Sequence, residues 1–305
     1  MPEHIARISY GKDSLKMLEV IHSRGLPLDR ITTADVWATD TISANLPPME
    51  EFKARMDERI WQLYRIQVEH LCARDKDGTK KTYEQMFYHV PVRRSQSAQV
   101  ERENRVKPGV ILGFPDLWNP WCQAGLKRNA RTPGTTGVSN SRLGQSPPFS
   151  NEPATTGGDR NIVEYLGIAA DEPERHGQLN DRKRAPLVEF GIDEDLCGLY
   201  CQYNDMLSPS YETSCRDGCW FCHNQGVNQM RLLRRNWPDH WALLMKWDLD
   251  SPVTFRADGR TVHDFDRRFA MEDMGLIPTD RTFRWAMLDV QPKFIPMVGE
   301  QLKVF

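Results

Sequence analysis

Runs of apolar and β-branched residues alternate with helix-like repeats through the first part of the chain. Residues 4–10, 31–37 and 67–73 have the length and composition of strands. Between them, residues 12–23 and 49–65 place apolar side chains every three or four positions, the spacing of one helix face. Strands separated by helices of this length form parallel sheets with right-handed crossovers. The pattern predicts an α/β fold, an open, mostly parallel sheet with helices on both faces.

A long polar segment interrupts this alternation. Residues 129–160 are dominated by Gly, Ser, Thr and Pro and predict a flexible insert. The pattern resumes with a strand at 162–169, and residues 183–205 predict a short strand followed by a helix that begins near Asp193. We assign these segments to one α/β domain, residues 1–205.

The end of the chain has a different character. Residues 215–222 are rich in cysteine, and residues 227–236 and 238–247 have helical periodicity. The tail beyond them is less regular. We predict a cysteine-rich, mainly helical region at residues 206–305.

The composition is that of an ordinary globular protein. Of 305 residues, 39% are apolar and 27% are charged, a balance that excludes a disordered or fibrous chain. The net charge of -2 gives no overall attraction to nucleic acid or anionic lipid. No apolar run reaches the length of about 18 residues that spans a bilayer, and the N-terminus lacks a signal segment. We expect a cytoplasmic protein without a membrane partner, in which clustered cysteines indicate metal binding rather than disulfides.

The turn between the first strand and the first helix has the residues of a phosphate-binding loop. It runs Ser9-Tyr10-Gly11-Lys12-Asp13-Ser14. Gly11 permits a backbone conformation that other residues resist, Lys12 adds a positive charge, and the helix start presents N–H groups to an anion. The second glycine of a Walker loop is absent, and a plain strand–turn–helix corner has similar residues. The position of the loop, at the carboxyl end of a first strand, favours phosphate binding.

Three cysteines form a second candidate site. Cys215, Cys219 and Cys222 have the spacing C-x3-C-x2-C, which lets three thiolates converge on one soft cation or cluster. Unrelated cysteines are the plain alternative. Radical-SAM enzymes use the same spacing, but early in a barrel, whereas this motif lies late in the chain.

The loop resembles the Ser-Gly-Gly-Lys-Asp-Ser loop of the adenine-nucleotide hydrolase superfamily, which includes N-type ATP pyrophosphatases and phosphoadenosine-phosphosulfate (PAPS) reductases. Tyr10 departs from that loop, where those families usually have glycine. Asp40 and Thr41, after the second strand, resemble the Asp-Thr pair of the same proteins.

A third motif, residues 165–175, is similar to the Gly-Ile-Arg-x-x-Glu-Ser-x-x-Arg segment of PAPS reductase relatives. Gly167 and Arg175 match it, and Ala169 replaces its first arginine. A strand followed by a solvated acidic turn is the plain alternative. The three motifs lie in family order over about residues 4–245, and the chain is identified as PAPS-reductase-like, in the form found on mobile elements.

The resemblance also implies a cofactor. Cys122 precedes Leu126-Lys127, as a cysteine does in the iron–sulfur members of the family. The implied ligands of a [4Fe-4S] cluster are therefore Cys122, Cys215, Cys219 and Cys222. Zinc is the alternative metal for four thiolates. Cys72, Cys197 and Cys201 are expected to pack as small apolar residues, although Cys197 or Cys201 is an alternative to Cys122.

The leading functional hypothesis is α,β-cleavage of ATP with Mg²⁺, in which a protein or nucleic-acid acceptor is adenylated and then receives sulfur or nitrogen. Lys12 and Asp13 are the implied catalytic residues. The implied nucleotide-binding residues are Ser9, Tyr10, Gly11, Lys12, Asp13, Ser14, Asp40, Thr41, Gly167 and Arg175.

Two alternatives stay open. One is a sulfonucleotide reductase that forms sulfite from PAPS or its unphosphorylated analogue with Cys197 or Cys201, because no cysteine follows Cys222. The other is a non-catalytic nucleotide-binding accessory of a mobile-element or defence complex. The oligomeric state is also open.

Overall fold

The computed structural model describes most of the chain. The described residues are 2–75, 77–90, 109–115, 120–128, 130, 161–212 and 218–289. The predicted insert, apart from Ala130, and the predicted metal ligand Cys215 lie outside these residues.

A five-stranded sheet forms the centre of the α/β part, and all its pairings are parallel. Its strands are β1 (Glu3–Ile8), β2 (Arg30–Asp35), β3 (Val68–Cys72), β4 (Ile162–Leu166) and β5 (Lys183–Arg184). The order β3-β2-β1-β4-β5 confirms the predicted open parallel sheet. The chain runs outward from β1 to β3 and then returns to the other side of β1. The direction of winding therefore reverses between β1 and β4, where such sheets bind their ligands.

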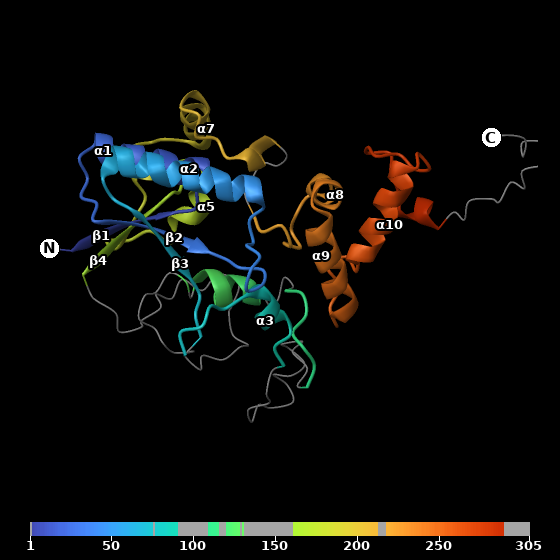
Figure 1. Cartoon of the computed structure of the whole chain (residues 1–305). Helices are drawn as coiled ribbons and strands as arrows, with labels where there is room; N and C mark the ends of the chain where they lie inside the picture. Colours follow the sequence, from blue (N-terminus) through green and yellow to red (C-terminus); the bar gives the residue numbers. More distant parts are fainter. Residues whose placement is uncertain are drawn as a thin grey trace, which may run out of the picture.

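Helices α1 (Lys12–Ser23) and α2 (Pro47–Tyr64) lie over one face of the sheet (Figure 1). Further helical segments surround the sheet: α3 (Tyr83–Phe87), η1 (Gln123–Arg128), α5 (Pro173–His176), α6 (Pro186–Glu189) and α7 (Glu194–Tyr203). The core beneath α1 and α2 joins apolar residues of three strands to both helices. Helix α7 packs on α1 from outside, with Cys197 and Cys201 buried at the contact.

A second core is built mainly from aromatic rings. It unites α3 with the later helices α8 (Val227–Asn236), α9 (Pro238–Asp250) and α10 (Val262–Asp273). The short turns η2 (Pro209–Glu212) and η3 (Trp285–Leu288) complete the described elements. None of the described helices is long and apolar enough to cross a membrane.

The structure departs from the predicted elements in two places. Helix α10 occupies part of the tail that we expected to be irregular. Thr261 begins it with a capping box to Asp264, and Val262, Phe265 and Phe269 bury one side. Strands β1 and β4 end earlier than predicted, because residues 9–11 and 167–169 leave the sheet to form the loops at the reversal point.

Candidate functional site

The loop from Ser9 to Ser14 joins β1 to α1 at the point where the winding reverses. Its left-handed residue is Tyr10, with φ of 60°, whereas Gly11 has an ordinary φ of -74°. The unusual backbone conformation that we expected at Gly11 therefore lies one residue earlier. The Ser9 N–H donates to the Ser14 hydroxyl at 3.2 Å, and that hydroxyl donates to the Gly11 carbonyl at 2.9 Å. These bonds close the loop around the start of α1.

The side chain of Tyr10 holds this conformation. Its ring is 1% exposed, and its hydroxyl donates to Asp57 and lies 3.2 Å from Nε2 of His70. His70 lies between two carboxylates, with Nδ1 2.8 Å from Asp35 and Nε2 2.9 Å from Asp57. Lys53, itself buried, donates to Asp35 at 2.5 Å. A left-handed conformation costs a residue with a side chain about 1–2 kcal/mol, and the buried, hydrogen-bonded tyrosine offsets that cost. We call these five residues the Tyr10 anchor.

The charges of the Tyr10 anchor stabilise one another. Hydrogen bonds to Asp35 and Asp57 raise the pKa of His70 to about 9, so that the imidazole is protonated at neutral pH. Burial would raise the pKa of Asp35, but the His70 hydrogen bond and the charge of Lys53 outweigh burial and lower it. Because Tyr10 belongs to the loop, this network fixes the loop to β2, α2 and β3.

Lys12 extends from the first turn of α1 toward α7. Its ammonium donates to Glu194 at 2.8 Å and to Asp13 at 3.1 Å. Burial alone would lower the pKa of Lys12, but these hydrogen bonds outweigh it and raise the pKa. The N-cap residue Gly11 supplies no side-chain hydrogen bond, so the first N–H groups of α1 have no capping side chain. Lys12 and the helix start are the kind of groups that would hold an anion, and we call them the anion-binding corner.

Three carboxylates meet beside Lys12. One oxygen each from Asp13, Glu172 and Glu194 lies within 4.8 Å of the other two. Burial raises the pKa of Asp13; the charge of Lys12 opposes the rise and those of Glu194 and Glu172 add to it. Arg175 donates to Glu172 at 2.7 and 2.8 Å from the exposed side. Clustered carboxylate oxygens are the ligands that Mg²⁺ prefers, and we call this set the carboxylate group.

Gly167, directly after β4, allows the loop to approach the sheet. A Cβ at this position would lie 2.9 Å from both Cα and N of Ser14, closer than atoms pack. We expect Gly167→Ala to lower the free energy of unfolding by about 1–3 kcal/mol through overpacking. Urea denaturation checks this value.

Gly198→Ala is the matched control. Its Cβ would meet only Cδ of Lys12, at an ordinary 3.9 Å, and the residue lies inside α7. Alanine there is expected to stabilise the protein by up to about 1 kcal/mol through helix propensity. Equal stability of the two variants would contradict the close approach at Gly167.

Two of the predicted nucleotide-binding residues lie apart from this site. Asp40 and Thr41 are exposed in a turn, where the Asp40 carbonyl accepts from Lys80 at 2.6 Å. No hydrogen bond or ion pair joins them to the loop among the residues that the structure describes. The end of β2 is connected to the loop by Asp35 instead. Asp35 contacts His70, and His70 contacts the Tyr10 hydroxyl of the loop.

Several residues of the site were not predicted from the sequence. They are Asp35, Lys53, Asp57, His70, Glu172 and Glu194. Asp35 lies in a predicted strand and ends β2, and Glu194 lies at the start of a predicted helix, which are positions typical of α/β sites. Asp57 and His70 lie inside regular elements, where the sequence carries no signal of a site.

The predicted cysteine site is partly described. Cys122, beside η1, and Cys219 pack against the aromatic core around Tyr83, and Cys222 follows Cys219 by three residues. Burial, followed by the charges of Cys219 and Cys222, raises the pKa of Cys122 to about 12. Burial also raises the pKa of Cys219, and Lys127 opposes that rise. Cys122 and Cys219 therefore belong to one core, but the three described cysteines are not among the described groups whose ligand atoms all lie within 4.8 Å of one another.

Cys197 and Cys201 lie elsewhere, in the core beneath α1. Burial and then the charge of Asp13 raise the pKa of each thiol to about 12. Both are therefore neutral thiols at pH 7, and they belong to a different core from Cys122 and Cys219. This placement agrees with their expected packing as small apolar residues.

No family model, curated protein or solved structure matches this chain.

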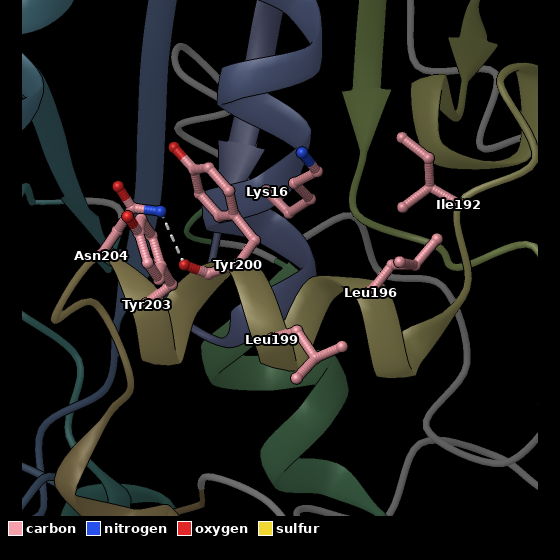
Figure 2. Close-up of a pocket in the computed structure, with 7 residues that line it drawn as sticks. All are labelled: Lys16, Ile192, Leu196, Leu199, Tyr200, Tyr203 and Asn204. Carbon is pink, nitrogen blue, oxygen red and sulfur yellow. Dashed lines mark hydrogen bonds between the residues drawn. The ribbon is translucent and has the colours of Figure 1, made fainter.

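The two sides of α7 differ in character. The inner side carries Glu194 and Gly198 against Lys12, as described above. The outer side carries a groove of about 450 Å³, lined by Leu196, Leu199 and Tyr203 among others (Figure 2). This groove is mainly apolar, and none of the carboxylate group lines it.

Proposed function

We propose that the protein is a PAPS-reductase-like nucleotide-binding enzyme that binds ATP with Mg²⁺ and cleaves it between the α and β phosphates. The observation that carries this proposal is the anion-binding corner of Lys12 and α1 beside the carboxylate group, at the reversal point between β1 and β4. A cation site next to an anion site suits a metal-bound polyphosphate better than a free anion. The acceptor, which we propose to be a protein or a nucleic acid, would receive the adenylyl group.

Different side chains of the site would bind the phosphates and the Mg²⁺ ion. Lys12 and the N–H groups at the start of α1 would hold phosphate oxygens, and Lys12 would stabilise the charge that develops on the departing pyrophosphate. Asp13, Glu172 and Glu194 would hold Mg²⁺, which neutralises phosphate charge. The Tyr10 anchor keeps the loop in position without contact to the phosphates. Ser9, Ser14 and Gly167 shape the loop.

The charge balance explains why a metal is required. The carboxylates of Asp13, Glu172 and Glu194 outnumber the two cations, Lys12 and Arg175, around the site. A free triphosphate would therefore meet net repulsion there. A bound divalent cation reverses that balance, and we expect nucleotide affinity to depend steeply on Mg²⁺.

The thiols around Tyr83 fit a cysteine-bound metal centre. Cys122, Cys219 and Cys222 would supply three ligands, and Cys215 is the proposed fourth. The buried hydroxyl of Tyr83 and indole nitrogen of Trp121 have no hydrogen-bond partner in the described residues. The sulfide of an iron–sulfur cluster would offer acceptors to these two donors. We therefore propose an iron–sulfur cluster, with zinc as the alternative metal. The proposed compartment is the cytoplasm, where thiols stay reduced.

Sulfonucleotide reduction is less well supported. That reaction needs a thiolate to attack sulfur. Cys197 and Cys201 are buried, and their pKa of about 12 leaves almost no thiolate at pH 7. This observation favours ATP chemistry over the reductase hypothesis.

Pyrophosphate release tests the proposal. The wild-type protein is expected to release pyrophosphate from ATP with Mg²⁺ and an acceptor supplied by a cell extract. Glu172→Gln is expected to raise the Mg²⁺ concentration for half-maximal rate at least about tenfold. Loss of a residue that only hydrogen-bonds to a metal ligand already lowers metal affinity by about tenfold or more. The same titration measured as ATP binding needs no acceptor.

The matched control is Glu174→Gln. It removes the same charge two residues further on, inside α5, at an exposed position outside the carboxylate group. Its Mg²⁺ dependence should equal that of the wild type. ATP binding without pyrophosphate release would favour the accessory hypothesis, and equal Mg²⁺ dependence of all three proteins would exclude a metal at the carboxylate group.

A further inference from the structure

We propose that Glu194 makes the Lys12 site selective for metal-bound polyphosphate over free anions, because its carboxylate occupies the ammonium until an anion that brings its own cation displaces it. This inference rests on the proposed function and deepens it, since it names the side chain that excludes free anions. Glu194 is thus a specificity-determining residue as well as a proposed ligand of Mg²⁺.

The ammonium of Lys12 has a partner for each of its donors. It donates to the Glu194 carboxylate at 2.8 Å, to Asp13 at 3.1 Å and to the Glu194 carbonyl at 3.4 Å. A lysine ammonium has three donors, so these three acceptors match them one for one. The side chain of Lys12 is only 13% exposed, which leaves little access for water. A phosphate oxygen can therefore bind this ammonium only in place of one of the three acceptors.

Of these acceptors, the Glu194 carboxylate is the one that can leave. The Glu194 carbonyl lies in the first turn of α7, which Asp193 caps, and the Glu194 N–H donates to Asp171 at 3.0 Å. The backbone at this position is therefore held in place. The Asp13 side chain is 22% exposed, whereas the Glu194 side chain is 46% exposed. The longer and more exposed carboxylate can turn away from Lys12 without movement of the helix.

Two further contacts hold α7 against Lys12. The Cys201 thiol donates to the Lys12 carbonyl at 3.5 Å. The aliphatic part of the Lys12 side chain passes close to Gly198, where a Cβ would lie 3.9 Å from Cδ of Lys12. Both residues lie on the side of α7 that packs on α1. Substitution of the Glu194 side chain alone should therefore leave the helix in its place.

The displacement of Glu194 has a different result for a free anion and for a metal-bound one. A free anion that takes Lys12 leaves the Glu194 carboxylate without this cation, beside Asp13 and Glu172, in a group whose oxygens lie within 4.8 Å of one another. Like charges at this spacing repel one another. Mg²⁺ carried by a nucleotide offers the displaced carboxylate a new cation at the same place. Glu194 therefore opposes metal-free anions and yields to metal-bound polyphosphate.

The experiment measures the ATP affinity of four full-length proteins by titration calorimetry, once with EDTA and once with Mg²⁺. Glu194→Gln removes the carboxylate charge and keeps the length of the side chain. Glu194→Asp keeps the charge but shortens the side chain, so that its oxygens reach less far toward Lys12. Asp195→Asn is the matched control, because it removes a carboxylate from the next position of α7, which is exposed. The fourth protein is the wild type, and thermal unfolding checks that all four are folded.

We expect Glu194→Gln to bind metal-free ATP about fivefold tighter than the wild type, as the loss of a competing, partly exposed ion pair predicts. Its affinity for Mg²⁺-bound ATP should not rise, so its preference for the metal-bound nucleotide falls. Glu194→Asp should show part of the gain without metal, and Asp195→Asn should match the wild type in both titrations.

Three results would overturn this role of Glu194. They are equal metal-free affinity of Glu194→Gln and the wild type, an equal gain with and without Mg²⁺, and a gain in Glu194→Gln that is absent from Glu194→Asp or equally present in Asp195→Asn. The last would assign the effect to charge rather than to the contact with Lys12. Wild-type binding of ATP with Mg²⁺ keeps the proposed function whichever of these results is found, and its absence would reject the proposed function itself.

Discussion

Replacement of Lys12 by methionine is expected to weaken binding of Mg²⁺-bound ATP by about tenfold to a hundredfold and to abolish pyrophosphate release. Methionine keeps the length of the side chain but removes the only lysine that reaches the carboxylate group among the described residues. A hydrogen bond to a charged group contributes about 1.5–3 kcal/mol, which corresponds to this range of affinity. Titration calorimetry measures the binding, and a pyrophosphate assay measures the reaction.

Lys16→Met is the matched control for this experiment. Lys16 lies one turn further along α1, where it donates to Glu19 at 2.6 Å and faces the ring of Tyr200 at 4.3 Å. The control therefore removes the same charge from the same helix without touching the loop. Thermal unfolding of both variants separates lost binding from lost stability. Unchanged ATP affinity of folded Lys12→Met protein would rule out the loop as the phosphate site.

Replacement of His70 by glutamine is expected to destabilise the protein by about 2 kcal/mol at neutral pH and to remove a pH dependence of stability. Because Asp35 and Asp57 raise the pKa of His70 to about 9, its contribution is fully present below about pH 6.5. The contribution is lost as pH rises through 9. The full pKa difference corresponds to more than 3 kcal/mol, but the imidazole is 35% exposed, so solvent screening reduces the expected value to about 2 kcal/mol.

The measurement is the free energy of unfolding of both proteins from pH 6 to pH 10. The difference between wild type and His70→Gln should be largest near pH 6 and shrink toward zero by about pH 10. Other titrating groups are the same in both proteins, so their contributions cancel in the difference between the two free energies of unfolding. His22→Gln, at an exposed position in α1, should follow the wild-type curve. A difference that is constant with pH would contradict the ionised Tyr10 anchor.

The same variant connects the anchor to the proposed nucleotide site. Asp57 and His70 hold Tyr10 in its left-handed conformation, and Tyr10 precedes Gly11 and Lys12. Loosening of the anchor therefore shifts the backbone that carries the anion-binding corner. A weaker affinity of His70→Gln for ATP, alongside the stability change, would follow from this connection.

The fold was predictable because it follows from short-range patterns. The helix Lys12–Ser23 was predicted with the bounds that the structure has, since its apolar spacing and its flanking glycines are local signals. The order of strands and helices followed from the same periodicity. Helix α10 was missed, although Thr261 and Asp264 form a capping box at its start and apolar residues follow at helical spacing.

Residues of the candidate sites were predictable only where they lie together in one short segment of the sequence. The loop Ser9–Ser14 and the cysteine spacing are local strings, and the sequence alone determined both of them as candidates. The sequence also identified Tyr10 as the departure from a glycine, without indicating how a tyrosine is accommodated. Asp40 and Thr41, chosen by their position after a strand, lie in a turn away from the loop.

The sequence by itself therefore determined the parallel α/β architecture and placed a lysine-bearing loop at the end of its first strand. Only the tertiary structure decided what surrounds that loop. Lys12 meets Glu194 from 182 positions away, and Tyr10 meets His70 from 60. Periodicity of apolar residues specifies which faces are buried, but it does not specify which polar groups meet once those faces pack. The left-handed Tyr10 and the carboxylate group are both results of that packing.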